Sequence, residues 1–126
     1  MPRPQTVLVV DDDVAIRVLL EAVLTRMNLE VAVAEDGEVA LENLRRTDFD
    51  LILLDLMMPK ITGYDFLERL HAETDASRHP HIIVFTAAGQ RGVEKIPPNR
   101  ICQTILKPFD LETFIEMIGR CLNGGH

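Results

Sequence analysis

Five apolar segments recur along the chain, separated by stretches in which apolar residues are spaced three and four positions apart. The segments at residues 7–10, 51–54 and 82–85 are continuous apolar runs with no polar alternation. Such runs are typical of strands covered on both faces, as in a parallel sheet between two layers of helices. The remaining two segments, residues 31–33 and 101–106, are shorter or contain polar residues, and the second suits an edge strand.

The intervening stretches have the periodicity of amphipathic helices. Asp13 and Asp110 stand directly before two of them and suit the N-cap position, and Asn28 suits the end of the first. Between residues 89 and 100, Gly and Pro residues allow at most a short helix. The clearer helices are expected over residues 14–27, about 39–46, about 64–74 and 111–122.

Five strands alternating with about five helices predict an α/β fold. In this fold a doubly wound parallel sheet carries helices on both faces and is connected by right-handed crossovers. We find no internal repeat and no linker long enough to divide the chain. The expected organisation is one domain over residues 6–122, with flexible ends at residues 1–5 and 123–126.

Composition narrows the function classes. The chain has 126 residues, of which 47% are hydrophobic, and a net charge of −7. The acidic balance argues against nucleic-acid binding, which needs a basic face. The apolar runs are too short to span a bilayer and the N-terminus has no signal-peptide pattern, so we expect a cytoplasmic protein without membrane contact. Cys102 and Cys121 lack metal or redox spacing and are expected to be buried free thiols.

Polar residues close four of the five strands: Asp11 and Asp12, Asp55, Thr86, and Lys107. Taken singly, each has an ordinary explanation as a loop or surface residue. Parallel strands, however, bring their carboxyl ends to one edge, where open α/β sheets bind ligands. Clustered carboxylates need a compensating cation, and oxygen-only donors suit Mg²⁺ or Mn²⁺. A carboxylate beside such a cation, a lysine and a hydroxyl is also a potential acceptor of a phosphoryl group.

These residues lie in four ordered motifs: Val-Val-Asp-Asp-Asp ending at Asp13, Asp-Leu-Met-Met-Pro from Asp55 with Gly63, Thr86-Ala, and Lys107-Pro-Phe. Together they resemble the receiver domain of two-component response regulators over roughly residues 6–122. The resemblance implies a flavodoxin-like sheet with strand order 2-1-3-4-5. It also implies a cis peptide bond between Lys107 and Pro108.

The resemblance further implies that Asp55 accepts a phosphoryl group from a histidine kinase or a histidine phosphotransfer protein. Asp12, Asp55 and the Met57 carbonyl would bind Mg²⁺ directly, and Asp11 through water. Thr86 and Lys107 would contact the phosphoryl oxygens. The protein would act as a switch for an unidentified effector, as a monomer or a weak phosphorylation-dependent dimer, and not as an enzyme beyond its own phosphorylation and dephosphorylation.

One departure from the family pattern bears on the switch. Thr104 stands three positions before the lysine, where the family commonly has an aromatic residue. A switch in which an aromatic ring swings inward therefore cannot operate in its usual form. Two positions that vary in the family bear instead on the lifetime of the phosphorylated state. They are occupied here by Met57 and Ala88, two positions after Asp55 and Thr86, which cannot orient an attacking water, so we expect slow self-dephosphorylation.

Three alternatives differ in class. The first is a receiver-like interaction module that works without phosphorylation. The second is a small Mg²⁺-dependent aspartyl phosphohydrolase of the haloacid-dehalogenase type, although Ala15 stands where that motif has Thr or Val and no cap domain fits. The third is a flavin-binding domain, which the three consecutive aspartates before the first helix disfavour.

Overall fold

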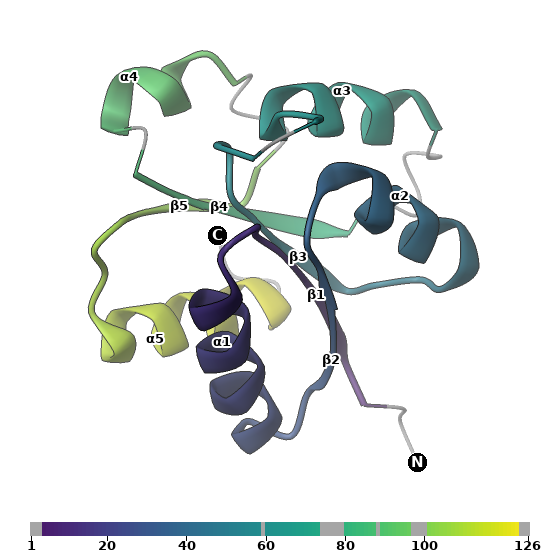
Figure 1. The fold of residues 1–126 in the computed structure, drawn as a ribbon. Coiled ribbons are helices and arrows are strands. Elements are labelled where there is room, and N and C mark those ends of the chain that lie inside the picture. Colours follow the sequence, from purple (N-terminus) through teal and green to yellow (C-terminus); the bar gives the residue numbers. More distant parts are fainter. Residues whose placement is uncertain (1–3, 59, 74–79, 88, 97–100, 124–126) are drawn as a thin grey trace.

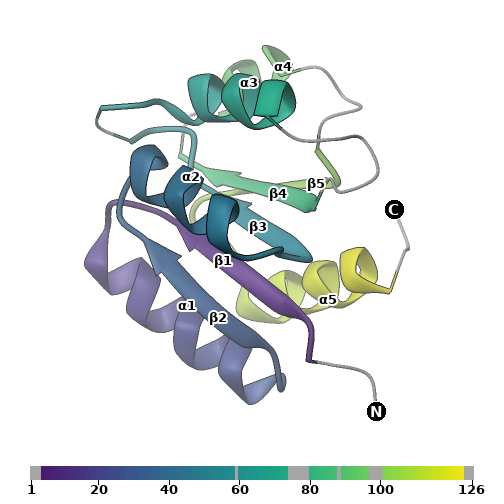
Figure 2. The same ribbon diagram turned by 90° about the vertical axis from the view of Figure 1, so that its right-hand side faces the viewer.

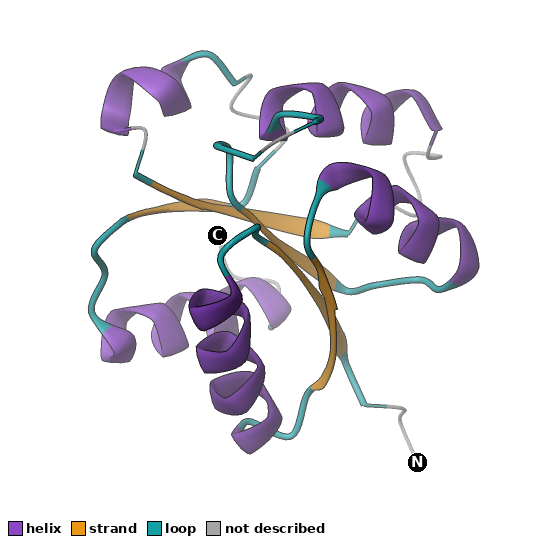
Figure 3. Cartoon of the chain, in the orientation of Figure 1, coloured by secondary structure: helices purple, strands orange, loops and turns teal. Residues whose placement is uncertain are grey.

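In the computed structural model the chain forms a five-stranded parallel sheet with helices on both sides (Figures 1 and 3). The structure describes residues 4–58, 60–73, 80–87, 89–96 and 101–123. The strands are β1 (Thr6–Val10), β2 (Glu30–Ala34), β3 (Leu51–Leu54), β4 (His81–Thr86) and β5 (Gln103–Leu106). The helices are α1 (Val14–Arg26), α2 (Gly37–Arg46), α3 (Gly63–Glu73), α4 (Gly89–Glu94) and α5 (Leu111–Leu122).

The strand order is β2-β1-β3-β4-β5, and every neighbouring pair is parallel. Helices α1 and α5 cover one face of the sheet, while α2, α3 and α4 cover the other (Figures 1 and 2). The predicted fold class and strand order are therefore confirmed. In this order β1, β3, β4 and β5 are consecutive neighbours, which brings together the ends of the four strands that polar residues close.

The sheet separates two hydrophobic clusters, one on each face. Every residue of β3 is fully buried, and alternate residues of this strand enter opposite clusters. This arrangement accounts for the continuous apolar run at residues 51–54, because a strand covered on both faces has no solvent side to mark with polar residues. None of the helices within the described ranges is long and apolar enough to cross a membrane.

Helix ends follow the expected capping chemistry. The Asp13 carboxylate accepts hydrogen bonds from the backbone N–H groups of Ala15 and Ile16, and the Asp110 carboxylate accepts one from Thr113. Helix α1 ends at Arg26, and Asn28 adopts φ 63°, a left-handed conformation that Asn tolerates after a helix. Both N-caps and the end of the first helix are thus confirmed.

The least regular part of the fold lies between β4 and β5. Helix α4 has six residues, as the Gly and Pro content allows. Pro97 and Pro98 lie outside the described residues. Strand β5 begins at Gln103 rather than at residue 101, and it is an edge strand as expected. The expected flexible ends fall mostly on residues 1–3 and 124–126, which are also outside the described part.

The two cysteines depart from expectation, because Cys102 and Cys121 form a disulfide with a Cα–Cα distance of 6.6 Å. The prediction of two free thiols is therefore wrong. Cys121 is fully buried in the cluster beneath α1 and α5, and Cys102 packs against that cluster. Each cysteine thus fits an apolar pattern by itself. Only the packing of α5 beside β5 brings together two residues that are 19 positions apart.

Gly63, the first residue of α3, lies against the loop that follows β3. A Cβ atom at this position would lie 2.6 Å from Leu56 Cα and 2.9 Å from the Asp55 carbonyl oxygen. The Gly63 N–H also donates to the Leu56 carbonyl at 3.0 Å. The absence of a side chain thus allows α3 to begin directly against the segment that carries Asp55.

We expect Gly63→Ala to lower the free energy of unfolding by about 1–3 kcal/mol, because the new methyl group meets backbone atoms that cannot move aside alone. Gly119→Ala, in α5, is the matched control, since a Cβ there meets nothing within 4 Å. Removing a flexible residue from a helix should stabilise that variant by about 0.5–1 kcal/mol. Urea denaturation measures the free energy of unfolding of both variants. Equal effects of the two substitutions would contradict the close approach at Gly63.

Candidate functional site

Four polar residues lie at the carboxyl edge of the sheet. Asp11 directly follows β1, Asp55 follows β3, Thr86 ends β4 and Lys107 follows β5. Asp11 and Thr86 are fully buried, and Asp55 is 5% exposed. Two buried carboxylates at one edge are costly unless cations or hydrogen bonds compensate them, so their partners define the site.

Asp11 uses all of its polar groups within the protein. Its N–H donates to the Ala34 carbonyl at 3.1 Å, and its carbonyl accepts from Arg17 Nη1 at 2.7 Å. Carboxylate oxygen Oδ1 accepts from the Asp13 N–H at 2.9 Å, and Oδ2 accepts from Lys107 Nζ at 3.0 Å. Asp11 is therefore fixed from four directions at the start of the loop between β1 and α1.

Asp55 lies beside Asp11 because β1 and β3 are adjacent strands. Its N–H continues the pairing of the sheet by donating to the Val10 carbonyl at 3.0 Å. Oδ1 accepts from the Met57 N–H at 3.1 Å, and Oδ2 lies 3.4 Å from Lys107 Nζ. One side of the Asp55 carboxylate thus faces its own loop, while the other faces the lysine.

Lys107 connects the two buried carboxylates. Its ammonium lies 3.0 Å from Asp11 Oδ2 and 3.4 Å from Asp55 Oδ2, and 4.9 Å from the centre of the Phe85 ring. Its N–H donates to the Thr86 carbonyl at 2.9 Å, which extends the pairing of β5 with β4, and a cis peptide bond to Pro108 follows. The end of β5 thus directs the amine toward the neighbouring strands.

Burial has different net effects on the pKa of the Asp11 carboxyl and on that of the Lys107 ammonium. Burial raises the pKa of the Asp11 carboxyl, and this effect exceeds the opposing effects of the Asp13 N–H and of Lys107. Burial alone would lower the pKa of Lys107, but the hydrogen bonds and charges of Asp11 and Asp55 outweigh it and raise that pKa. The raised pKa keeps the lysine in its charged form, while burial still disfavours the charged form of the Asp11 carboxyl.

Three carboxylates form a possible cation site. One oxygen each from Asp11, Asp12 and Asp55 lies within 4.8 Å of the others, and Asp12 is exposed to solvent. Oxygen-only donors are the chemistry that Mg²⁺ prefers, and a cation would also offset the mutual repulsion of three neighbouring carboxylates. These residues fit a hard divalent ion. The Met57 side chain is 60% exposed, and its carbonyl remains a predicted ligand.

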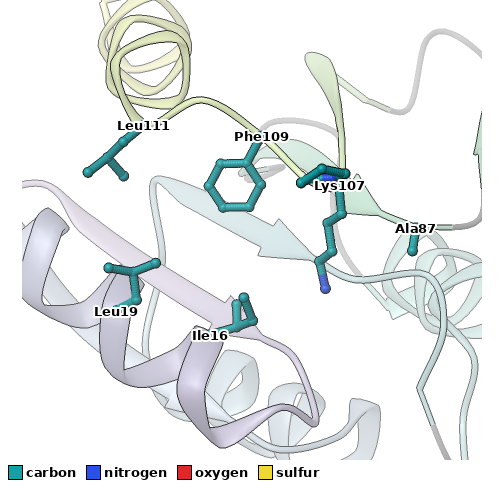
Figure 4. A pocket seen from close by; sticks show the side chains of 7 residues that line it. Ile16, Leu19, Ala87, Lys107, Phe109 and Leu111 are labelled. Carbon is teal, nitrogen blue, oxygen red and sulfur yellow. The ribbon is translucent and has the colours of Figure 1, made fainter.

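A largely apolar pocket of about 500 Å³ opens beside Lys107, between α1 and the segment that leads into α5 (Figure 4). Figure 4 shows Ile16 and Leu19 on α1 opposite Phe109 and Leu111. The residues that line the pocket are Ile16, Leu19, Ala87, Lys107, Pro108, Phe109 and Leu111. The pocket therefore shares Lys107 with the carboxylate site.

Some contacts at the site were not predicted from the sequence. Arg17 has the spacing of an exposed helix residue, yet its guanidinium binds the Asp11 carbonyl. The sequence has no signal for this contact, because it depends on how α1 leaves the sheet. Phe109 was noted as part of a motif but not as part of a pocket wall. Thr86 is at the site edge as expected, and Ala88 lies outside the described residues.

Comparisons with known proteins agree on one family. The family model described as the response regulator receiver domain matches residues 7–119. The chain is 42% identical over 88 residues to the probable transcriptional regulator ycf27 of Porphyra purpurea, covering 70% of this chain and 35% of that protein. It is 32% identical over 118 residues to the probable transcriptional regulator ycf29 of Cyanophora paradoxa, covering 93% and 56%. The chain thus spans about a third to just over half of these curated relatives.

Solved structures show the same fold. The chemotaxis protein CheY4 of Vibrio cholerae superposes with a TM-score of 0.84 at 27% identity, covering 94% of this chain and 99% of that one. The response regulator TrrA of Thermotoga maritima, in complex with Mg²⁺ and BeF, superposes with a TM-score of 0.81 at 27% identity, covering 93% and 98%.

We expect Lys107→Met to lower the free energy of unfolding at pH 7 by about 3 kcal/mol, because the substitution leaves Asp11 buried without its cation. The matched control is Lys60→Met. Lys60 also pairs with a buried aspartate, Asp36 at 3.4 Å, but its own side chain is 62% exposed. Solvent screening should limit the effect of that substitution to less than about 1 kcal/mol.

The effect of Lys107→Met should shrink as the pH falls toward the ordinary aspartate pKa of 3.8. Burial raises the pKa of the Asp11 carboxyl, so on acidification the folded state protonates this carboxyl at a higher pH than the unfolded chain does. This proton uptake favours folding. Chemical denaturation across this pH range measures the difference. A difference that stays constant or grows on acidification would contradict Asp11 as the buried partner.

Proposed function

Because the chain belongs to the response regulator receiver domain family of two-component systems, we propose that it is a phosphoryl-accepting signalling switch. Asp55 accepts the phosphoryl group from a phosphohistidine of a histidine kinase or a histidine phosphotransfer protein. One observation carries the proposal: the Asp55 carboxylate faces the Lys107 ammonium at 3.4 Å within a cluster of three carboxylates.

In the proposed reaction, an Asp55 carboxylate oxygen bonds to phosphorus. The bond between phosphorus and the histidine nitrogen breaks, and the nitrogen leaves with the electron pair. The Lys107 ammonium, already directed at Asp55, offsets negative charge on the phosphoryl oxygens. Thr86, at the end of the neighbouring strand, supplies a hydroxyl to one of these oxygens. The protein contributes mainly positioning and charge, as is general for phosphoryl transfer.

Mg²⁺, or Mn²⁺, would be held by Asp12, Asp55 and the Met57 carbonyl, with Asp11 acting through water. When bound, the ion would neutralise charge on the phosphoryl group and orient it. The four internal contacts of Asp11 support an indirect role, since both of its carboxylate oxygens already accept hydrogen bonds. The exposure of Asp12 supports direct coordination.

The phosphodonor is proposed to dock on the face of α1 beside the site. Val14, Val18 and Leu19 are exposed apolar residues of this helix, at 62%, 62% and 44% exposure. The adjoining pocket is lined by Lys107, so a partner seated there brings its phosphohistidine toward Asp55. A helix with an apolar face suits this surface. Phosphorylation would then alter binding to a downstream protein, with the domain a monomer or a weak phosphorylation-dependent dimer.

The proposal predicts labelling at a single residue. With phosphoramidate and Mg²⁺, the protein should gain the mass of one phosphoryl group, and Asp55→Asn should abolish this gain. Asp65→Asn, which removes an exposed carboxylate in the first turn of α3, should be labelled like the wild type. Intact-mass spectrometry measures the stoichiometry. An unlabelled wild type would instead favour a phosphorylation-independent interaction module.

Metal binding should depend on the exposed aspartate. We expect Asp12→Asn to weaken Mg²⁺ binding at least about tenfold, because the substitution removes a charged oxygen ligand. The control is Asp13→Asn, in the same loop, which keeps an oxygen for capping α1 and lies outside the carboxylate cluster. Isothermal titration with Mg²⁺ gives both affinities. Equal losses in the two variants would indicate a general effect of acidic charge rather than a site.

The lifetime of the phosphorylated state should be long, because Met57 cannot hydrogen-bond an attacking water. We expect Met57→Asn to accelerate loss of the phosphoryl group at least about threefold by orienting that water. Met57→Leu, which keeps an apolar side chain at this exposed position, should decay like the wild type. Mass spectrometry of the acyl phosphate over time measures the dephosphorylation rate of each variant. An unchanged rate in Met57→Asn would contradict the role given to Met57.

A further inference from the structure

The disulfide between Cys102 and Cys121 encloses the segment that carries the site's lysine. Cys102 lies one residue before β5, and Cys121 lies in the last turn of α5. The closed ring therefore contains β5, Lys107 and most of α5. As an edge strand, β5 pairs with β4 alone among the strands that the structure describes. The bridge thus joins the two ends of the last unit of the sheet, β5 with α5.

The two sulfur-bearing residues differ in accessibility. Cys102 is half-buried, whereas Cys121 has no exposed surface. An external thiol therefore reaches the bridge from the Cys102 side. The buried position of Cys121 keeps its thiol beside Cys102 after the bond opens, which favours closure again when an oxidant is present.

The fold does not need this bridge in order to form its core. The cluster on this face contains Leu20, Leu24 and Phe114, all fully buried, and a chain of 126 residues can bury enough surface without a covalent link. Both redox states are therefore compatible with a folded domain. What the bond adds is restraint on the ends of one unit, β5 with α5.

We propose that Cys102 and Cys121 form a reversible redox modification site that takes a small-molecule thiol or disulfide of the glutathione class as co-reactant. Its oxidation state sets the local stability of the β5–α5 unit and thereby how firmly Lys107 is held against Asp11 and Asp55. The reduced form leaves this unit free to open more often, while the rest of the sheet is unchanged.

The exchange balances in two steps. The thiolate of the small molecule attacks the Cys102 sulfur, forming a mixed disulfide and releasing Cys121 as a thiolate, which takes a proton from water. A second small-molecule thiolate then attacks the small-molecule sulfur of the mixed disulfide, releasing the Cys102 thiolate and one small-molecule disulfide. Two electrons pass from the two small thiols to the protein bridge, and oxidation is the reverse.

Thiol counting tests the modification itself. The full chain is equilibrated in mixtures of reduced and oxidised glutathione, then unfolded in denaturant that contains iodoacetamide so that the buried Cys121 is also reached, and weighed. We expect either no alkylation or two alkylations per chain, with a reversible transition between them. A chain that stays doubly alkylated in excess oxidised glutathione, or that cannot be reduced without denaturant, would overturn the proposal.

Hydrogen exchange tests the structural consequence. Reduction should speed exchange of the β5 and α5 amides roughly tenfold more than that of the β1 and β3 amides, which exchange only through global unfolding. It should also lower Tm by roughly 10 °C, because the closed ring restrains the unfolded chain. If reduction changed the exchange of all strands equally, or left β5 and α5 unchanged, the proposal that the bridge sets the local stability of the β5–α5 unit would be wrong.

The control is Cys102→Ser, which removes the bridge at the more exposed position and leaves Cys121 in place. This variant should exchange like reduced wild type and show no response to redox potential. A continued response would mean that the reagent acts elsewhere, which overturns the proposal. Neither measurement involves phosphorylation, so failure here leaves the labelling of Asp55 independent. Failure of that labelling would likewise leave the redox result intact.

Discussion

The site rests on one ammonium group placed against two buried carboxylates. Asp11 and Asp55 end up at the same edge because the strands that precede them are neighbours, and burial makes the charge of Asp11 costly. Lys107 approaches both of them from the far side of β4, at the end of β5. Without this cation the edge would hold uncompensated charge, which proteins rarely tolerate. Lys107 therefore stabilises the folded edge of the sheet, in addition to any role in phosphoryl transfer.

The strand order makes this convergence possible. Asp11 and Lys107 are 96 positions apart in sequence, and the crossover connections bring β1 and β5 to either side of β3 and β4. Each connection passes through a helix that closes one face of the sheet, so the same chain path builds the core and gathers the charges. The two hydrophobic clusters hold the strands rigid beneath the site. Rigid support of this kind keeps a small set of polar groups in register.

Much of the fold could be predicted because apolar runs and their polar ends carry direct physical meaning. The run before Asp55 is buried on both faces, and Asp55 itself lies at the carboxyl edge of the sheet beside the exposed Asp12. The Asp13 and Asp110 caps follow from local chemistry in the same way. The cis bond at Pro108 and the strand order came instead from the family resemblance.

Other features could not be predicted, because they depend on packing between distant elements. The bridge between Cys102 and Cys121 exists because α5 packs beside β5, and nothing in either local sequence distinguishes a bonded cysteine from a core residue. The bond from Arg17 to the Asp11 carbonyl depends on the angle at which α1 leaves the sheet. Because both Asp11 carboxylate oxygens already have partners within the protein while Asp12 is exposed, the proposed Mg²⁺ would be exchanged with solvent on the Asp12 side of the cluster.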